Sequence, residues 1–317
     1  MGKALLAVLV LLVVGGCIGQ EKAELSNWPH GHTSAVAITF ETERATDDQL
    51  EALVDILQNK GVGATFFVIP GYYQENPGAL DLLREFEVAN MGWYQTRWRD
   101  SPLTREFQDE QITRAHEWLT GKGFEVRGFR APFLKSTSET YDILHELGYA
   151  YDSTEYIGFM PYKIGNIVEI PLSVNYDLYW DEPSMNFSTG PAYIAFQKSH
   201  DESGLFTFYG HASRTYEHLE DFNTLLDYVG KRNVWFASAS EVADWWNKRE
   251  QLELRTEDGA VTVRNNGGES VAGAAIKIRG TWDADGAIDV KTVGGYTYAV
   301  LPDIEPGDAV SVELRKR

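Results

Sequence analysis

Short apolar runs alternate with helical patterns between residues 34 and 247, and this alternation limits the chain to a few folds. In the first unit, residues 35–40 read as a strand, residues 46–59 as a helix that ends at Lys60-Gly61, and residues 64–69 as the next strand. Repeated strand–helix units predict a parallel sheet, and this number of units favours closure into an α/β barrel over residues 34–249. Further strands are expected at residues 87–90, 128–130, 150–152, 167–171, 205–209 and 234–237, and further helices at residues 78–86, 104–122, 138–147, 190–199, 219–230 and 239–247.

The pattern changes to strands without helices after residue 249. Turn clusters such as Asn265-Asn266-Gly267-Gly268 separate these strands, as in an antiparallel unit built from hairpins. We therefore predict a small all-β domain, a β-sandwich, over residues 250–317. It carries no chemical motif, so a packing or spacer role and glycan binding both stay open. Trp245-Trp246, near the end of the last barrel helix, is expected to seal the barrel against this domain.

The N-terminus has the layout of an export signal. Lys3 is followed by an apolar run over residues 4–14 and then by small residues. This run is far shorter than the roughly 20 residues that a membrane-spanning helix requires. We expect residues 1–16 to be a signal peptide that is removed, and residues 17–33 to be a lipid-anchored tether. Cys17, the only cysteine, resembles a lipidation site, although a buried leftover cysteine is the alternative.

The charge of the chain restricts its partners. It carries 28 Lys and Arg against 47 Asp and Glu, a formal net charge of −19 at pH 7. Nucleic acid and anionic lipid would both be repelled by such a chain, so neither is expected as a partner. We expect a secreted lipoprotein on the extracellular face of the cell membrane, which touches the membrane only through its lipid anchor.

Polar stretches follow five of the predicted strands. In a parallel barrel the carboxyl ends of the strands gather at one rim, so these stretches are expected to share one mouth. The stretches are Ile38-Thr39-Phe40-Glu41-Thr42, Asn90-Met91-Gly92-Trp93-Tyr94-Gln95, Arg130-Ala131-Pro132, Tyr151-Asp152-Ser153 and Tyr209-Gly210-His211. In this order they resemble the motif series of the polysaccharide deacetylases, the carbohydrate esterase family 4 or NodB-homology domain. The resemblance covers about residues 34–247 and implies an irregular (β/α)7 barrel.

The resemblance also implies a role for each retained polar residue. Glu41 would be the catalytic base, one methylene longer than the aspartate of the family, and Arg130 would orient it. His211 would be the general acid and Asp152 the carboxylate that tunes it. Each residue has a structural alternative, because Arg130 with Asp152 could be an ion pair inside the barrel and His211 a core histidine.

The metal ligands of the family are all changed in this sequence. The family holds a divalent metal such as zinc with one aspartate and two histidines, and the corresponding positions are Thr42, Met91 and Gln95. A hydroxyl, a thioether and an amide form a poor cage for zinc. We therefore expect no bound metal and no other cofactor. Glu43 lies two residues beyond Glu41 and would point to the same side, so a carboxylate pair is possible.

Loss of the metal would be decisive for amide hydrolysis. A bound divalent metal lowers the pKa of water from 15.7 to about 7, which is on the order of 12 kcal/mol of nucleophile activation. Positioned acid–base groups supply roughly 3–5 kcal/mol. An unactivated amide is then out of reach, whereas an ester remains conceivable. His30-Gly31-His32 looks like a pair of metal ligands, but it precedes the first barrel strand. We expect it about 30 Å from Glu41, at the opposite rim of the barrel.

Aromatic residues near the motifs suggest a glycan groove, because their faces suit the apolar faces of sugar rings. Three functions follow. The leading one is an exported protein that binds N-acetylated glycan and has lost metal-dependent deacetylation, a pseudoenzyme. The second is an active polysaccharide deacetylase with an atypical site, and the third is a structural spacer of the envelope. The predicted substrate-binding residues are Trp93, Tyr94, Pro132 and Tyr156.

Overall fold

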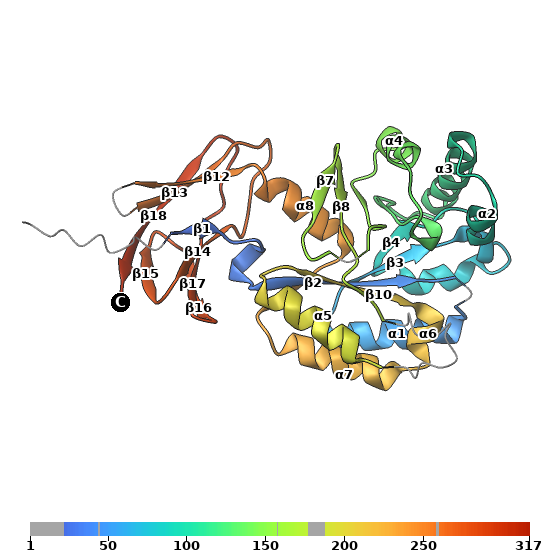
Figure 1. Cartoon of the computed structure of the whole chain (residues 1–317), viewed down its shortest axis with the longest axis horizontal. Coiled ribbons are helices and arrows are strands. Elements are labelled where there is room, and N and C mark those ends of the chain that lie inside the picture. Colours follow the sequence, from blue (N-terminus) through green and yellow to red (C-terminus); the bar gives the residue numbers. More distant parts are fainter. Residues whose placement is uncertain (1–21, 44, 157, 177–187, 258–259) are drawn as a thin grey trace, which may run out of the picture.

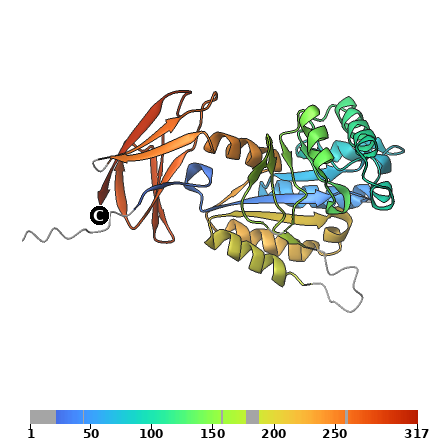
Figure 2. The ribbon, with the colours of Figure 1, turned by 45° about the horizontal axis from the view of Figure 1, so that its top comes forward.

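The computed structural model of the chain describes residues 22–43, 45–156, 158–176, 188–257 and 260–317. The predicted signal peptide and Cys17 lie outside these residues, so both stay predictions. Among the described residues, no helix is both long and apolar enough to cross a membrane. Figures 1 and 2 show two parts, a larger one of strands and helices and a smaller one made of strands.

The larger part is a sheet that curls into an irregular barrel. Its strands run in the order β9-β10-β2-β3-β4-β5-β6-β8, and all of these neighbours are parallel. Because β8 and β9 belong to one stretch of chain, residues 167–175 join the two ends of this order, and the predicted irregular (β/α)7 barrel is confirmed. The strands are β2 (Ser34–Glu41), β3 (Ala64–Val68), β4 (Glu87–Asn90), β5 (Gly128–Phe129), β6 (Tyr151–Asp152), β8 (Ile167–Glu169), β9 (Val174–Asn175) and β10 (Leu205–His211), with β7 (Tyr162–Ile164) antiparallel to β8 and β11 (Val234–Phe236) beside the start of β2.

The predicted helices are found, with one change of type, whereas α2 (Gln95–Asp100) and α6 (Ala212–Tyr216) were not predicted. Residues 77–83 form the 3₁₀ helix η3 (Pro77–Leu83) where an α-helix over residues 78–86 was expected. The first helix begins at a Thr46 capping box and ends at Gly61 in the left-handed conformation. The helices are α1 (Asp47–Lys60), α2 (Gln95–Asp100), α3 (Arg105–Gly121), α4 (Ser138–Glu146), α5 (Gly190–Asp201), α6 (Ala212–Tyr216), α7 (Leu219–Gly230) and α8 (Ala239–Arg249), with short 3₁₀ turns η1 (Pro29–Gly31), η2 (Pro70–Tyr72) and η4 (Pro132–Leu134).

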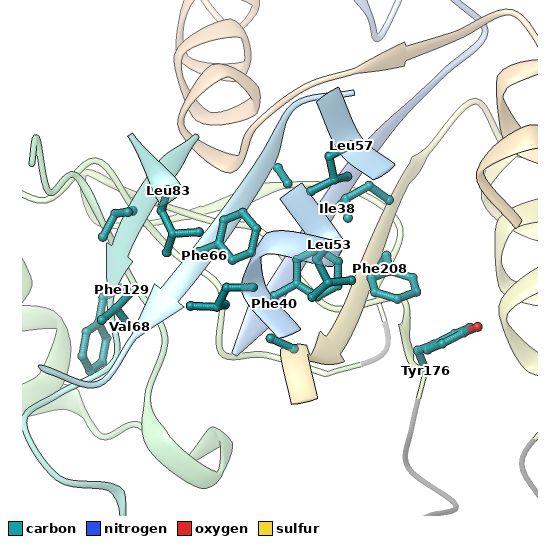
Figure 3. Packing of buried hydrophobic residues seen from close by; sticks show 14 of the residues in the cluster. Ile38, Phe40, Leu53, Leu57, Phe66, Val68, Leu83, Phe129, Tyr176 and Phe208 are labelled. Carbon is teal, nitrogen blue, oxygen red and sulfur yellow. The ribbon is translucent and has the colours of Figure 1, made fainter. Parts of the chain in front are cut away.

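The outer face of the barrel carries the main apolar core. Side chains alternate between the two faces of a strand, so Ile38 and Phe40 of β2 point outward toward Leu53 of α1 (Figure 3). Phe66 of β3 and Phe208 of β10 lie on either side, with ring centroids 5.3 and 5.7 Å from that of Phe40. This packing fixes the three central strands side by side.

The inner face of β2 carries the other set of residues. Ala35 and Ala37 are buried in a second apolar cluster, and their small side chains leave space inside the barrel. Thr39 and Glu41 continue this series toward the carboxyl end of the strand. Apolar packing therefore gives way to polar groups at the mouth, as the motif positions predicted.

Tryptophans close the other end of the barrel. Trp28 is fully buried, its indole nitrogen donates to the Ser203 carbonyl at 2.8 Å, and its ring centroid lies 5.8 Å from that of Trp246. The Trp245 indole donates to the Asn27 carbonyl at 2.7 Å. The apolar cluster around these rings continues into the all-β domain. The predicted seal between barrel and β domain is confirmed.

The smaller part consists of two four-stranded antiparallel sheets. It lies at the amino-terminal ends of the barrel strands, so the mouth is at the far end of the molecule (Figure 1). Two of its strands, β15 and β16, were not predicted; their sequence is polar and only partly buried. The sheets are β1 (Glu24–Leu25), β14 (Ala275–Arg279), β17 (Tyr296–Val300) and β16 (Asp289–Val293), and β12 (Leu252–Glu257), β13 (Ala260–Asn265), β18 (Ala309–Lys316) and β15 (Trp282–Asp285).

The predicted tether over residues 17–33 is wrong for the part that the structure describes. Residues 24–25 form β1, which pairs with β14 of the β domain, and Trp28 fills the seal. Arg249 donates to the Ser26 carbonyl at 3.0 Å and fixes the same segment to α8. This segment was predicted to be a linker because most of its residues are polar, and its one large apolar side chain, Trp28, gave no periodic pattern. His30 and His32 lie in this segment, and the His30 carbonyl accepts a hydrogen bond from Lys291 of the β domain at 3.0 Å.

We expect Trp28→Ala to lower the free energy of unfolding by about 3–5 kcal/mol, because it opens a cavity in the seal and removes a buried hydrogen bond. Chemical denaturation followed by circular dichroism measures the change. Ile194→Ala, on an α5 side chain that is 71% exposed, is the control and should stay within about 0.5 kcal/mol. Equal stability of the two variants would show that the seal contributes little.

Candidate functional site

The barrel mouth is built at the carboxyl ends of two adjacent strands. β2 and β10 are in register, so that Glu41 lies opposite His211. Glu43 follows on the loop after β2, and the carboxylates of both glutamates approach the same imidazole. His211 Nε2 lies 3.5 Å from Glu41 Oε2 and 3.2 Å from Glu43 Oε1. The sequence predicted that Glu41 and His211 would meet, and the structure brings Glu43 to them.

A buried guanidinium organises the inner side of the mouth. Arg130 is fully buried, and its Nε and Nη2 donate to the Ser153 carbonyl and hydroxyl at 2.8 and 2.9 Å. Nη2 also donates to the Thr39 hydroxyl at 3.0 Å. The guanidinium carbon lies 3.9 Å from the ring centroid of Phe67, and Nη1 lies 3.9 Å from Glu41 Oε1. Arg130 therefore lies beside the candidate base, as predicted.

Burial makes Glu41 hard to ionise. The carboxyl is 2% exposed, and this burial, together with the neighbouring carboxylate of Glu43, raises the pKa of Glu41 to about 7. His211 and Arg130 oppose the rise by favouring the anion. A carboxyl that changes protonation near neutral pH, next to an imidazole, has the properties of an acid–base pair.

That Asp152 tunes His211 stays a prediction, because the partners seen for Asp152 are other residues. Asp152 is fully buried and accepts a hydrogen bond from the Thr154 hydroxyl at 2.8 Å, and its other neighbour is the carboxyl of Glu169. Burial raises the pKa of Asp152 to about 6, although the hydrogen bonds from Glu169 and Thr154 oppose this. Burial and the charge of Asp152 raise the pKa of Glu169 well above its usual range. The pKa of each carboxyl is therefore held above its usual range by burial.

Glu169 was missed because it closes an apolar strand without any recognisable motif. Its Oε1 accepts from the backbone nitrogens of Thr154 and Glu155 at 3.1 and 2.9 Å, which pins the loop after β6. Its position at the carboxyl end of a predicted strand was the available signal. His211 has Glu41 and Glu43 as carboxylate neighbours.

Comparison with known proteins gives a family match for part of the chain. Residues 30–151 match the sequence model of the polysaccharide deacetylase family. This part of the chain is therefore similar to polysaccharide deacetylases. The match contains Glu41 and Arg130 but ends before His211. A search of curated protein sequences finds no significant match.

Solved structures share the fold. A protein of Mycobacterium smegmatis named as a polysaccharide deacetylase is 21% identical, with a TM-score of 0.61 over 70% of this chain and 93% of that chain. A Pseudomonas aeruginosa PAO1 protein with the same assignment is 17% identical, with a TM-score of 0.61 over 71% and 94%. Puue allantoinase is 14% identical, with a TM-score of 0.62 over 76% and 98%. Because an allantoinase has this fold too, the fold alone does not fix the substrate.

The positions that hold the metal in polysaccharide deacetylases do not fit a metal here. The Thr42 hydroxyl donates to the Phe67 carbonyl at 3.3 Å, and Met91 is fully buried in the inner apolar cluster. Gln95 begins α2, and its amide nitrogen lies 3.5 Å from Glu43 Oε1. None of the three side chains offers a carboxylate or an imidazole, the donors that zinc takes in such sites.

Of the predicted substrate-binding residues, Trp93 is placed differently from the expectation. It is 2% exposed, and the guanidinium carbon of Arg114 lies 4.1 Å from its ring centroid, so its faces are covered. Pro132 is also buried. Tyr94 is partly exposed and its hydroxyl accepts from Gln74 at 2.8 Å, while Tyr156 is 40% exposed.

Phe133 is an exposed aromatic residue at the mouth that the sequence analysis missed. It follows the Arg130-Ala131-Pro132 motif and is 38% exposed. Its φ of 56° is in the left-handed region, which is costly for a side chain with a Cβ. Tyr94, Phe133 and Tyr156 follow the adjacent strands β4, β5 and β6, and so they line one side of the mouth.

We expect Glu169→Gln to change how stability depends on pH. A carboxyl whose pKa is raised by folding stabilises the protein most at low pH, and this contribution is lost as pH rises through the folded pKa. That pKa is about 6 for Asp152 and well above the usual range for Glu169. The glutamine keeps the acceptor and removes one titrating group. Relative to the parent, the variant should gain at least about 1 kcal/mol of unfolding free energy between pH 4 and pH 8.

Denaturant unfolding across that pH range measures the difference. Glu106→Gln, an exposed carboxyl of α3, is the control and should give a difference that does not change with pH. A flat difference for Glu169→Gln as well would contradict the raised pKa of Glu169.

Proposed function

We propose that this chain is an exported, lipid-anchored protein of the cell envelope that binds N-acetylated glycan at the barrel mouth and has lost the metal-dependent deacetylation of its family. The observation that carries this proposal is the family's ligand set, which is replaced by Thr42, Met91 and Gln95. Without the metal at that position, roughly 12 kcal/mol of activation of the nucleophilic water is missing. Positioned acid–base groups contribute only about 3–5 kcal/mol to the reaction.

The aromatic side of the mouth supports glycan binding. Tyr156 and Phe133 are 40% and 38% exposed, so part of each ring is open to a ligand. Both follow strands that end at the mouth, beside the retained acid–base groups. Polysaccharide is the substrate class that the family name carries, and aromatic faces bind the apolar faces of sugar rings.

The arrangement of the two parts supports attachment to the envelope. The described N-terminal segment pairs with the β domain, which lies at the end of the barrel opposite the mouth (Figures 1 and 2). A lipid on Cys17 would therefore place the β domain near the membrane and direct the mouth away from it. This is the orientation in which a surface protein reaches extracellular glycan.

A second candidate is an active hydrolase with an atypical site. Glu41 and His211 are retained at 3.5 Å, and the pKa of Glu41 is raised to about 7, which suits a general base. Acetate release separates the two functions. We expect none from N-acetylglucosamine oligomers, and steady release that is lost in Glu41→Gln would establish the hydrolase instead.

We expect Tyr156→Ala and Phe133→Ala each to weaken binding to N-acetylglucosamine oligomers by about tenfold, because each removes an aromatic contact worth on the order of 1.4 kcal/mol. Isothermal titration calorimetry measures the affinity. Tyr156→Phe keeps the ring and should bind like the parent. Ile288→Ala, on a side chain of the β domain that is 65% exposed, is the second control. Unchanged binding in both alanine variants, or no binding by the parent, would favour the spacer function.

A further inference from the structure

Three side chains with metal-binding atoms meet at the mouth, none of them at a ligand position of the family. One ligand atom from each of Glu41, Glu43 and His211 lies within 4.8 Å of the others. The imidazole is nearest to both carboxylates, at 3.2 and 3.5 Å. Among the described residues, this is the only such group of histidine, cysteine and carboxylate side chains.

We propose that Glu41, Glu43 and His211 bind a divalent transition-metal cation, with zinc as the best match. The site is displaced from the family's ligand positions and uses the residues that correspond to its base and its acid. It was not expected from the sequence, which predicted a mouth without a metal.

The distances fit a coordination shell. Ligand atoms at about 2.1 Å from a tetrahedral zinc are about 3.4 Å from one another. The two distances from His211 Nε2 match this edge. The two carboxylates can be farther apart, up to 4.8 Å, and rotation of Glu43, whose side chain is 11% exposed, brings them closer.

A second observation points to a ligand at this place. Glu41 Oε1 is buried and accepts no hydrogen bond from the described residues, although a hydrogen bond from Tyr209 acts on the Glu41 carboxylate and Arg130 Nη1 lies 3.9 Å from Oε1. A buried carboxylate oxygen without a donor is costly, and coordination of a cation satisfies it. Arg130 cannot move closer freely, because its other nitrogens are held by Ser153 and Thr39.

The chemical types of the donor atoms indicate which ion fits the site. Two carboxylate oxygens and one imidazole nitrogen suit zinc and its first-row neighbours, and the set contains no soft sulfur donor that would favour copper(I). Three protein ligands leave at least one coordination position open, and the 27% exposed His211 gives solvent access to it. In the loaded state Glu41 and His211 are ligands, so they cannot also act as the free base and the free acid.

The test is zinc binding by the purified full chain after treatment with a chelator. We expect one zinc per chain by elemental analysis, and isothermal titration calorimetry should show affinity that falls by at least about 100-fold in Glu43→Gln and in His211→Gln. Both side chains are partly exposed, so the variants should fold, which circular dichroism checks. Thr42→Ala should bind zinc like the parent.

His30→Ala with His32→Ala removes the two histidines beside the β domain and serves as the control for surface binding. It should leave the stoichiometry unchanged. Absence of binding, or zinc that survives both mouth variants and is lost with the His30 and His32 pair, would overturn the proposal. In the alternative arrangement, a protonated His211 neutralises Glu41 and Glu43 without a metal, and no zinc binding is then expected. Glycan binding is measured separately, so its failure leaves this result unaffected.

Discussion

The buried guanidinium of Arg130 is the constraint on which the mouth depends. A charge inside a barrel is tolerated only when hydrogen bonds and counter-charges surround it. Arg130 obtains these from Ser153, Thr39 and the nearby carboxylate of Glu41, and it packs on the ring of Phe67. These contacts hold the ends of β2, β5 and β6 in one arrangement. None of them involves the positions that correspond to the metal ligands of the family.

The acid–base groups of the mouth are arranged as two separate sets around this guanidinium. One set, Asp152 with Glu169, is deeply buried, has pKa values raised by that burial, and fixes the loop after β6. The other set, Glu41 and Glu43 with His211, reaches solvent. In this chain the carboxylate expected to tune His211 has a structural partner, and a loop glutamate lies beside the imidazole. Loss of the three family ligands is therefore one part of a wider change of the site.

Much of the fold could be predicted because strand and helix periods are local properties. The alternation in β2 placed Glu41 on the inner face, and the strand ends placed Arg130 and His211 at one mouth. The contacts that were not predicted join segments far apart in the sequence. Trp93 is covered by Arg114 of α3, and Asp152 is paired with Glu169 of β8, although neither pairing leaves a periodic signal. The folded N-terminal segment was missed for the same reason, because Trp28 packs against residues about two hundred positions away.

The central claim is that the cation-binding chemistry of this barrel has moved to Glu41, Glu43 and His211. Crystals of the full chain grown with zinc, measured at the zinc absorption edge, test it most directly. The account predicts one anomalous peak within about 2.0–2.2 Å of an atom from each of these side chains. A peak between Thr42, Met91 and Gln95, or a mouth without any peak, would contradict it.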